Sequence, residues 1–174
     1  MNRRIKVVLG LMSIIIAISL VSLTIGKEIM DGQNPSLFYF GLINFLGYLF
    51  FLLLPVESLV PIYQAFGHDG LVLIIIAVAT AILAQPINYA IGYLMSSEVI
   101  KGLIGLQKYE KAESYIQNYG RLAIFFFNLT PLSSSVLSLV AGMLRFKFRT
   151  LMLYSFLGLL IKYFTIVYLF KLFY

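Results

Sequence analysis

The sequence contains no cysteine, a single histidine and few charged residues. The absence of cysteine excludes disulfides, thiolate metal ligands and cysteine nucleophiles, and it leaves the cellular compartment open. Charged residues make up 11% of the 174 positions and hydrophobic residues 61%, and the mean hydropathy is +0.96. Soluble domains carry about 25% charged residues. The composition therefore predicts an integral membrane protein, and residues 1–174 are long enough for a single transmembrane domain with a few spans.

The motifs of common catalytic chemistry are also missing. An intramembrane serine protease needs a serine and a base within hydrogen-bond reach. The single histidine, His68, is predicted on the opposite membrane face from Ser133 and Ser134. The sequence has no HExxH motif, Walker A loop or Cys/His cluster. The basic runs are short and flank apolar segments. We therefore expect no enzymatic activity, no cofactor, no metal site and no nucleic-acid partner.

Apolar stretches and one polar segment organise the chain. The apolar stretches cover residues 7–25, 37–54, 71–95, 122–144 and 151–170. The first is longer than the apolar core of a signal peptide and ends without a small-residue cleavage site, so we expect a retained span. The polar segment, residues 96–121, predicts two short interfacial helices separated near Gly105. In the second of these, Ala112, Tyr115, Ile116 and Tyr119 share one helical face.

An acidic residue directly follows the second apolar stretch. Glu57 lies between Pro55 and Pro61 in a run that is otherwise almost entirely apolar. A charge at the centre of a bilayer costs about 2.5 kcal/mol or more, and proline removes a backbone donor and crowds the preceding turn. Broken backbone at membrane depth is tolerated only inside protein or against a water-filled cavity. The run predicts a re-entrant helix with Glu57 at its tip, or else a kinked span with a locally paired Glu57.

The fourth apolar stretch is interrupted in a similar way at Pro131. Asn128 precedes this proline, and Ser133 and Ser134 follow it. The two serines either line a polar cavity with Asn128 or hydrogen-bond the carbonyl groups that Pro131 leaves unpaired. These alternatives are equally compatible with the sequence.

Three further polar residues are candidates for a site. Lys162 is the single cation inside a predicted span, so it is the expected partner of Glu57, although a lysine can also extend its side chain to the interface. Gln85 is better explained as a bridge between helices than as a substrate ligand. Arg145 is explained as a cytoplasmic anchor that also attracts anionic head groups.

The placement of Lys and Arg decides between two topologies. If all five stretches cross the membrane, the loops on the two sides carry equal numbers of these residues. If residues 37–66 and 122–144 instead dip in and return, ten of the 13 Lys and Arg residues lie inside and two lie outside. The positive-inside rule favours the second arrangement. We therefore predict an all-α membrane domain with three full spans, two re-entrant hairpins from opposite faces and a cytoplasmic amphipathic segment, residues 96–121.

The two halves of this arrangement, residues 37–95 and 122–170, form an inverted repeat. A shift of 75 positions aligns identical residues in the two halves: Phe51 with Phe126, Ser58 with Ser133, Gly67 with Gly142 and Tyr93 with Tyr168. Each half contains a broken helix, a glycine turn and a span. Weak internal symmetry of this kind is typical of transporters whose binding site lies near the midplane.

Several short motifs, in this order, resemble the DedA family of VTT or SNARE-associated domain proteins. The motifs are Pro55-Val56-Glu57, Tyr89-Ala90-Ile91-Gly92, the segment Lys111–Gly120, Asn128-Leu129-Thr130-Pro131 and Ala141–Arg145. The resemblance runs from about residue 40 to residue 170. It implies two opposed re-entrant hairpins and a role in moving lipids across the bilayer, in bacteria notably the carrier undecaprenyl phosphate.

The chain departs from the family pattern at charged positions. Gln85 stands where the family has aspartate, and Asn128 and Ser134 stand where it has two arginines. Residues 43–45 lack a further expected acid. Glu57 is the one charged position that carries over. If the arginines of the family hold a lipid phosphate, this chain holds it in another way or binds a different head group.

These observations predict a lipid transporter of the plasma membrane with a cytoplasmic N-terminus. It would be a flippase or scramblase for a polyprenyl phosphate or a phospholipid, either proton-coupled through Glu57 or passive. The expected partners are membrane lipids with an anionic head group and a second copy of the chain. Two alternatives remain open, a non-transporting assembly or structural factor and a small-ion or solute antiporter. The candidate substrate- or proton-binding residues are Glu57, Lys162, Asn128, Ser133, Ser134, Gln85 and Arg145.

Overall fold

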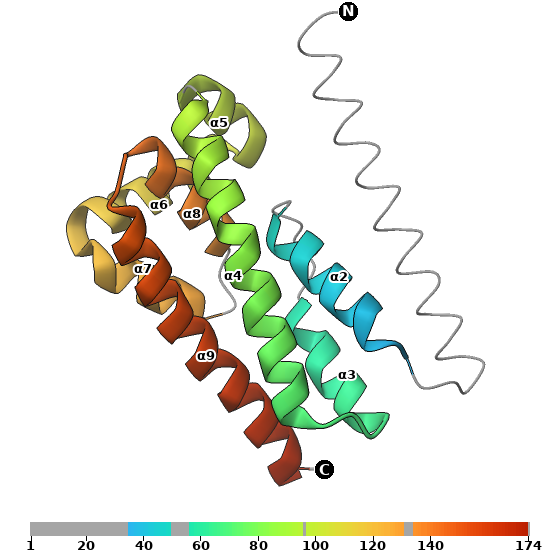
Figure 1. Cartoon of the computed structure of the whole chain (residues 1–174). Helices are drawn as coiled ribbons and strands as arrows, with labels where there is room; N and C mark the ends of the chain where they lie inside the picture. Colours follow the sequence, from blue (N-terminus) through green and yellow to red (C-terminus); the bar gives the residue numbers. More distant parts are fainter. Residues whose placement is uncertain (1–34, 50–55, 96, 131–133, 174) are drawn as a thin grey trace, which may run out of the picture.

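The computed structural model describes residues 35–49, 56–95, 97–130 and 134–173, and within them the chain is helical without strands (Figure 1). The predicted span 7–25 and the residues Pro55, Pro131 and Ser133 lie outside the described residues. The elements are α2 (Leu37–Leu49), η1 (Val56–Ser58), α3 (Leu59–Ala65), α4 (Gly70–Leu94), α5 (Ser97–Ile104), α6 (Leu106–Tyr119), α7 (Arg121–Leu129), α8 (Ser134–Met143) and α9 (Phe148–Phe173).

Two long apolar helices form the centre of the molecule. α4 has 25 residues and α9 has 26. The most apolar 18 residues have a mean hydropathy of 2.4 in α4 and 1.8 in α9. At 1.5 Å per residue each helix is roughly 38 Å long, which exceeds the hydrocarbon thickness of about 30 Å. They correspond to the predicted spans 71–95 and 151–170. The two helices pack against each other and run in opposite directions (Figure 1). α4 continues through Pro86 without a break in its helical assignment.

The segment α2–η1–α3 forms a first hairpin that returns to the end from which it starts. His68 Nε2 lies 2.8 Å from the carbonyl oxygen of Pro35, and the Tyr63 hydroxyl donates to the carbonyl oxygen of Ser36 at 3.3 Å. These contacts join the residues before α2 to the residues at the end of α3. Pro61 lies in the first turn of α3, where a backbone N–H has no intrahelical acceptor. Pro61 is therefore accommodated within the first turn of α3.

The helices α7 and α8 form a second hairpin at the opposite end of α4 and α9 (Figure 1). Both helices pack against α6. At the end of α8, the Tyr109 hydroxyl of α6 lies 3.2 Å from Met143 Sδ. The Tyr89 hydroxyl of α4 donates to the carbonyl oxygen of Phe146 at 2.8 Å, just after α8. These contacts hold the end of α8 at the end of the molecule that carries α5 and α6.

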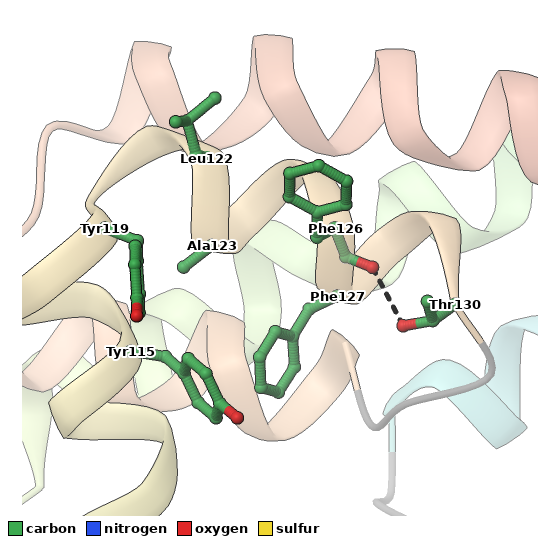
Figure 2. Close-up of a pocket in the computed structure, with 7 residues that line it drawn as sticks. All are labelled: Tyr115, Tyr119, Leu122, Ala123, Phe126, Phe127 and Thr130. Atoms are coloured by element: carbon green, nitrogen blue, oxygen red, sulfur yellow. Dashed lines mark hydrogen bonds between the residues drawn. The ribbon is translucent and has the colours of Figure 1, made fainter.

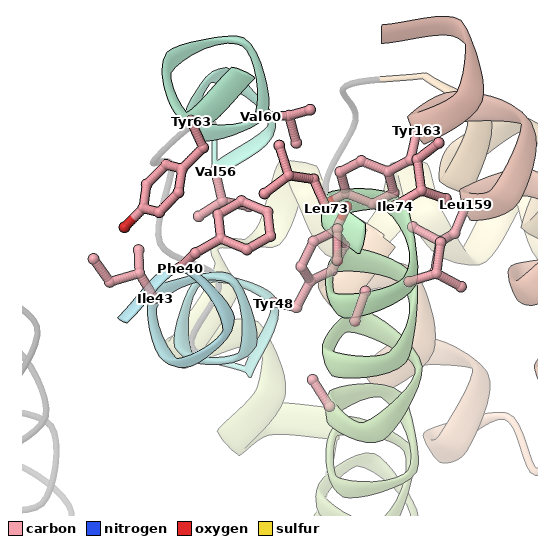
Figure 3. Packing of buried hydrophobic residues seen from close by; sticks show 14 of the residues in the cluster. Phe40, Ile43, Tyr48, Val56, Val60, Tyr63, Leu73, Ile74, Leu159 and Tyr163 are labelled. Atoms are coloured by element: carbon pink, nitrogen blue, oxygen red, sulfur yellow. Dashed lines mark hydrogen bonds between the residues drawn. The ribbon is translucent and has the colours of Figure 1, made fainter. Parts of the chain in front are cut away.

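The two hairpins contact the long helices in opposite order. α2 packs on α4 and α7 packs on α9, whereas α3 packs on α9 and α8 packs on α4. The first hairpin buries a cluster of apolar and aromatic side chains against α4 and α9, including Phe40, Val60, Tyr63, Leu73 and Leu159 (Figure 3). Each hairpin is thus held by both long helices.

Glycines bring the backbones of α4 and α8 into direct contact. A Cβ atom added at Gly92 would collide with the carbonyl group of Leu139, and one added at Gly142 would collide with the carbonyl group of Tyr89. Small residues permit this approach of helices inside a membrane. The close contact explains why each of the two motifs that resemble the DedA pattern, Tyr89–Gly92 and Ala141–Arg145, contains a glycine.

The polar segment folds as the two helices α5 and α6. Gly105, with φ 86°, separates them as predicted. α6 buries Tyr109, Ala112 and Ile116, whereas Tyr119, which we placed on the buried face, is exposed. The buried stripe is thus rotated toward Tyr109. Burial raises the pKa of the Tyr109 phenol to about 12, and the nearby Glu113 carboxylate adds to this effect.

Candidate functional site

An ion pair joins the first hairpin to α9. Glu57 Oε1 lies 2.7 Å from Lys162 Nζ, and the side chains are 19% and 4% exposed. The 3-10 turn η1 carries Glu57 at the turn between α2 and α3, and Lys162 lies near the middle of α9. The prediction that Lys162 is the partner of Glu57 is confirmed. Lys162 points into the protein instead of extending to the interface.

Aromatic hydroxyl groups extend this ion pair into a network that we call the charged centre. The Tyr48 hydroxyl donates to Glu57 Oε1 at 3.2 Å and accepts from Lys162 Nζ at 3.3 Å. The Tyr163 hydroxyl lies 3.2 Å from the Tyr48 hydroxyl and 3.0 Å from Asn44 Oδ1. Because Tyr163 has one proton, it can donate to only one of these oxygens at a time. The charged centre comprises Glu57, Lys162, Tyr48, Tyr163 and Asn44.

Asn44 anchors the charged centre to α4. Its Nδ2 atom donates to the carbonyl oxygen of Ala77 at 2.9 Å and to Thr80 Oγ1 at 2.8 Å. Sequence reasoning missed Asn44, Tyr48 and Tyr163. Asn44 falls among residues 43–45, where the DedA resemblance leads us to expect an acid, and a single amide in an apolar run was the available signal. The two tyrosines are members of a tyrosine-rich sequence, and nothing in their spacing separates them from lipid-facing aromatics.

A second polar network, which we call the amide centre, lies between α4 and the second hairpin. Gln85 Nε2 donates to Asn128 Oδ1 at 2.8 Å. Asn128 Nδ2 donates to the carbonyl oxygen of Ile124 at 2.8 Å and to Ser155 Oγ at 3.1 Å. Asn88 Nδ2 donates to the carbonyl oxygen of Tyr48 at 2.8 Å. The amide centre comprises Gln85, Asn88, Asn128 and Ser155, all with 0% exposure.

Tyr48 connects the two centres. Its hydroxyl belongs to the charged centre, while its backbone carbonyl accepts from Asn88 of the amide centre. Asn88 and Gln85 lie one turn apart on α4, so this helix contacts α2 through Asn88 and α7 through Gln85.

The other predicted residues lie apart from the centres or have a structural contact. Ser134 is buried, and its carbonyl oxygen accepts from Ser138 Oγ at 3.0 Å, which is a hydrogen bond within α8. Arg145 is exposed after the end of α8, with a φ of 54°, and its guanidinium lies 5.2 Å from the ring centre of Tyr93. That position suits an interfacial anchor. Among the described residues, no three His, Cys, Asp or Glu side chains come together as a metal site.

An apolar groove of about 330 Å³ opens between α6 and α7 (Figure 2). Its walls carry aromatic rings, and Thr130 closes one end by donating to the carbonyl oxygen of Phe126 at 2.8 Å. The remaining lining residues are Tyr115, Tyr119, Leu122, Ala123 and Phe127. A groove with this lining suits an acyl chain better than a head group.

The family model of the VTT domain matches residues 45–172, which is most of the chain. The chain belongs to the VTT-domain (DedA) family. No curated protein and no solved structure matches it significantly. The family match and the two long apolar helices identify a membrane protein.

The VTT domain match covers the amide centre, both glycines of the α4–α8 contact and every residue of the charged centre except Asn44. At two positions where the DedA pattern led us to expect charge, this VTT-domain protein has amides that contact each other. Gln85 replaces the expected aspartate, Asn128 replaces an expected arginine, and the two hydrogen-bond at 2.8 Å. Both positions are therefore neutral in this chain, and their side chains hydrogen-bond each other.

Proposed function

We propose that this VTT-domain protein moves lipids between the leaflets of the plasma membrane, as a flippase or scramblase for a phospholipid or a polyprenyl phosphate. The observation that carries the proposal is the buried ion pair of Glu57 and Lys162 within an all-helical membrane domain. Buried charges inside a membrane face a cavity or a partner and mark substrate or proton pathways.

In the proposed arrangement, α2–η1–α3 and α7–α8 are re-entrant hairpins that enter from opposite faces. Two features support this. The hairpins return to opposite ends of the molecule, and they exchange partners on α4 and α9 as the halves of an inverted repeat do. The count of Lys and Arg then places α5, α6 and the N-terminus in the cytoplasm, with the end of α9 outside.

In the proposed mechanism, the protonation state of Glu57 decides whether Lys162 pairs with Glu57 or with another anion. While Glu57 is ionised, it neutralises the buried ammonium group at 2.7 Å. When Glu57 takes up a proton, that charge is lost and Lys162 needs another anion, because an unpaired buried charge is costly. A lipid phosphate supplies it. When Glu57 releases the proton, the ion pair forms again and the phosphate leaves. Tyr48 and Tyr163 contribute hydroxyl groups to the same hydrogen-bonded network.

Lipid movement in vesicles containing the purified full chain tests this proposal. We expect labelled phospholipid to change leaflet faster than in protein-free vesicles, at a rate that depends on pH. Glu57→Gln keeps a hydrogen-bonding oxygen near Lys162 and should remove the pH dependence. Lys162→Met should slow anionic lipids more than neutral ones. Lys171→Met is the matched control, because Lys171 is exposed on the same helix and lies outside both centres. Unchanged pH dependence in Glu57→Gln would refute the mechanism.

A further inference from the structure

An apolar groove of about 450 Å³ lies between α2 and α4, which pack side by side (Figure 1). All of its lining residues come from these two helices, and they include Phe38, Phe45 and Leu83. Gly41 also lines the groove, and it has no side chain to fill it. Phe38 is 72% exposed and Leu83 is 63% exposed. The described part of the chain therefore leaves a concave apolar face on the first hairpin.

The polar residue in the lining of this groove already has hydrogen-bond partners. It is Thr80, whose hydroxyl group donates to the carbonyl oxygen of Ile76 at 2.7 Å and accepts from Asn44 Nδ2 at 2.8 Å. The groove therefore suits an apolar occupant. Inside a membrane, such an occupant is held by van der Waals packing, because lipid tails are as apolar as the groove itself.

The sequence contains an apolar segment that can reach this groove. Residues 7–25 lie outside the described residues and outside the VTT domain match. The point at which this part of the chain joins the fold is fixed, because the carbonyl oxygen of Pro35 lies 2.8 Å from His68 Nε2. Leu37 already lines the groove. Residues 26–34 alone separate the apolar segment from that point, and consecutive elements are usually adjacent in space.

On a helix, residues 7–25 present small side chains along one face. At about 100° per residue, four of them fall within about 60° of one another. These four are Gly10, Ser13, Ala17 and Thr24. Small residues allow helices to approach each other closely inside a membrane. This face would meet the large side chains of the groove, and alternation of large and small residues is what close packing requires.

Two other grooves suit this segment less well. The groove between α6 and α7 lies beside α6, at the end of the molecule opposite Pro35 (Figure 1). A groove of about 400 Å³ between α3, α4 and α9 has Asp69 and Lys171 in its lining. Charged side chains are costly to cover with an apolar helix. The α2–α4 groove is therefore the better match in both position and chemistry.

We propose that residues 7–25 dock into the α2–α4 groove as a transmembrane helix, with Ala17 and Thr24 facing the groove. Helices joined by a short connection are antiparallel, so the end of this helix meets the beginning of α2. Thr24 then lies near Phe38, and Ala17 lies near Phe45. The docked helix holds α2 against α4 from the lipid side. This proposal goes beyond lipid movement and does not depend on it.

Disulfide cross-linking in membranes tests the docking, because the chain has no native cysteine. The test variant is the full chain with Ala17→Cys and Phe45→Cys, and the matched control has Ser19→Cys and Phe45→Cys. Ser19 lies about 3 Å further along the helix but points about 160° away from Ala17. Because a disulfide needs Cα atoms about 4.4–6.8 Å apart, we expect a cross-link within one chain to form at least about tenfold faster in the test variant on mild oxidation.

A second pair of variants keeps the test decisive if a substitution at Phe45 prevents folding. Thr24→Cys/Phe38→Cys uses an exposed residue of the groove, and Ser22→Cys/Phe38→Cys is its control. The docking stands if either test variant cross-links within one chain faster than its control. Equal rates, or no cross-link in any variant, would overturn it and leave the groove to lipid. Cross-links between two chains, seen at twice the mass on a gel, would assign the groove to a second copy instead.

A bulky side chain on the small face gives an independent check. In the Thr24→Cys/Phe38→Cys background, Ala17→Phe should slow the cross-link, because the added ring cannot fit between the two helices. Ser19→Phe should leave the rate unchanged, since Ser19 lies on the opposite face. Equal slowing by both substitutions would contradict the assignment of this face to the groove.

Discussion

The charged centre and the amide centre lie on either side of Tyr48 and differ in how fully their polar groups are paired. In the charged centre, the ammonium of Lys162 and the Oε1 atom of Glu57 both have partners. In the amide centre, Gln85 Oε1 and Asn88 Oδ1 have no partner among the described residues. Protonation of Glu57 would remove a charge from the charged centre, whereas the amide centre contains no ionisable side chain. The proposed proton response therefore belongs to the charged centre alone.

The two centres should also differ in how much a single substitution lowers the free energy of unfolding. Removing one member of a buried ion pair leaves the other charge unpaired, so the charged centre is sensitive to single substitutions. The amide centre is uncharged, and it loses less when one partner of a neutral hydrogen bond is removed. Four substitutions probe this contrast, and they follow in order of expected effect on the free energy of unfolding.

Glu57→Leu has the largest expected effect, because it leaves the ammonium of Lys162, which is 4% exposed, without its carboxylate. We expect a loss of about 3–5 kcal/mol in the free energy of unfolding. The double variant Glu57→Leu/Lys162→Met should recover most of this loss, because no buried charge remains. Circular dichroism during unfolding in detergent measures both. Additive losses in the double variant would mean that the two charges are not coupled.

Gly142→Ala tests whether the α4–α8 contact supports the amide centre. The added methyl group meets the Tyr89 backbone, which cannot move as a flexible side chain would. We expect a loss of about 3 kcal/mol, at the upper end of the range for overpacking. Gly102→Ala is the control, because a Cβ atom at Gly102 of α5 meets no atom within 4 Å. It should stabilise the chain by about 0.5–1 kcal/mol. The same unfolding assay distinguishes the two glycines, and equal effects would contradict the close packing.

Asn128→Leu tests how much the amide centre contributes to stability. It leaves the Gln85 amide nitrogen without its acceptor. An unsatisfied buried group costs about 1–3 kcal/mol, so we expect a loss near 2 kcal/mol. Gln85→Leu/Asn128→Leu should cost less than the sum of the two single substitutions. A double-mutant cycle measures that coupling energy, and strict additivity would argue against the contact.

Tyr48→Phe has the smallest expected effect. It removes the hydroxyl of the charged centre and keeps the backbone carbonyl that Asn88 binds. We expect a loss of about 1 kcal/mol. Because the ion pair at 2.7 Å remains, lipid movement should stay pH-dependent. Loss of the pH dependence in Tyr48→Phe would show that the proton response needs the Tyr48 hydroxyl as well as the ion pair.

The sequence by itself determined the class of the protein and the charged residues that matter. Long apolar runs must be helical to satisfy their backbone groups in lipid, so the spans α4 and α9 follow from hydropathy alone. A charge inside such a run needs a partner, and Lys162 was the one cation available to Glu57. Gly105 marked the boundary of α5 and α6 because a positive φ favours glycine.

Only the tertiary structure decided which uncharged polar groups meet. Gln85 and Asn128 are 43 residues apart, and Tyr48 and Tyr163 are 115 apart. Nothing in local periodicity distinguishes a tyrosine that faces Glu57 from one that faces lipid. The oxygens of Gln85 and Asn88 that lack a partner among the described residues could not be predicted either. Whether an atom has a partner depends on all of its neighbours in the folded protein. Hydropathy can be read along a single helix, whereas hydrogen bonding between side chains depends on how several helices pack together.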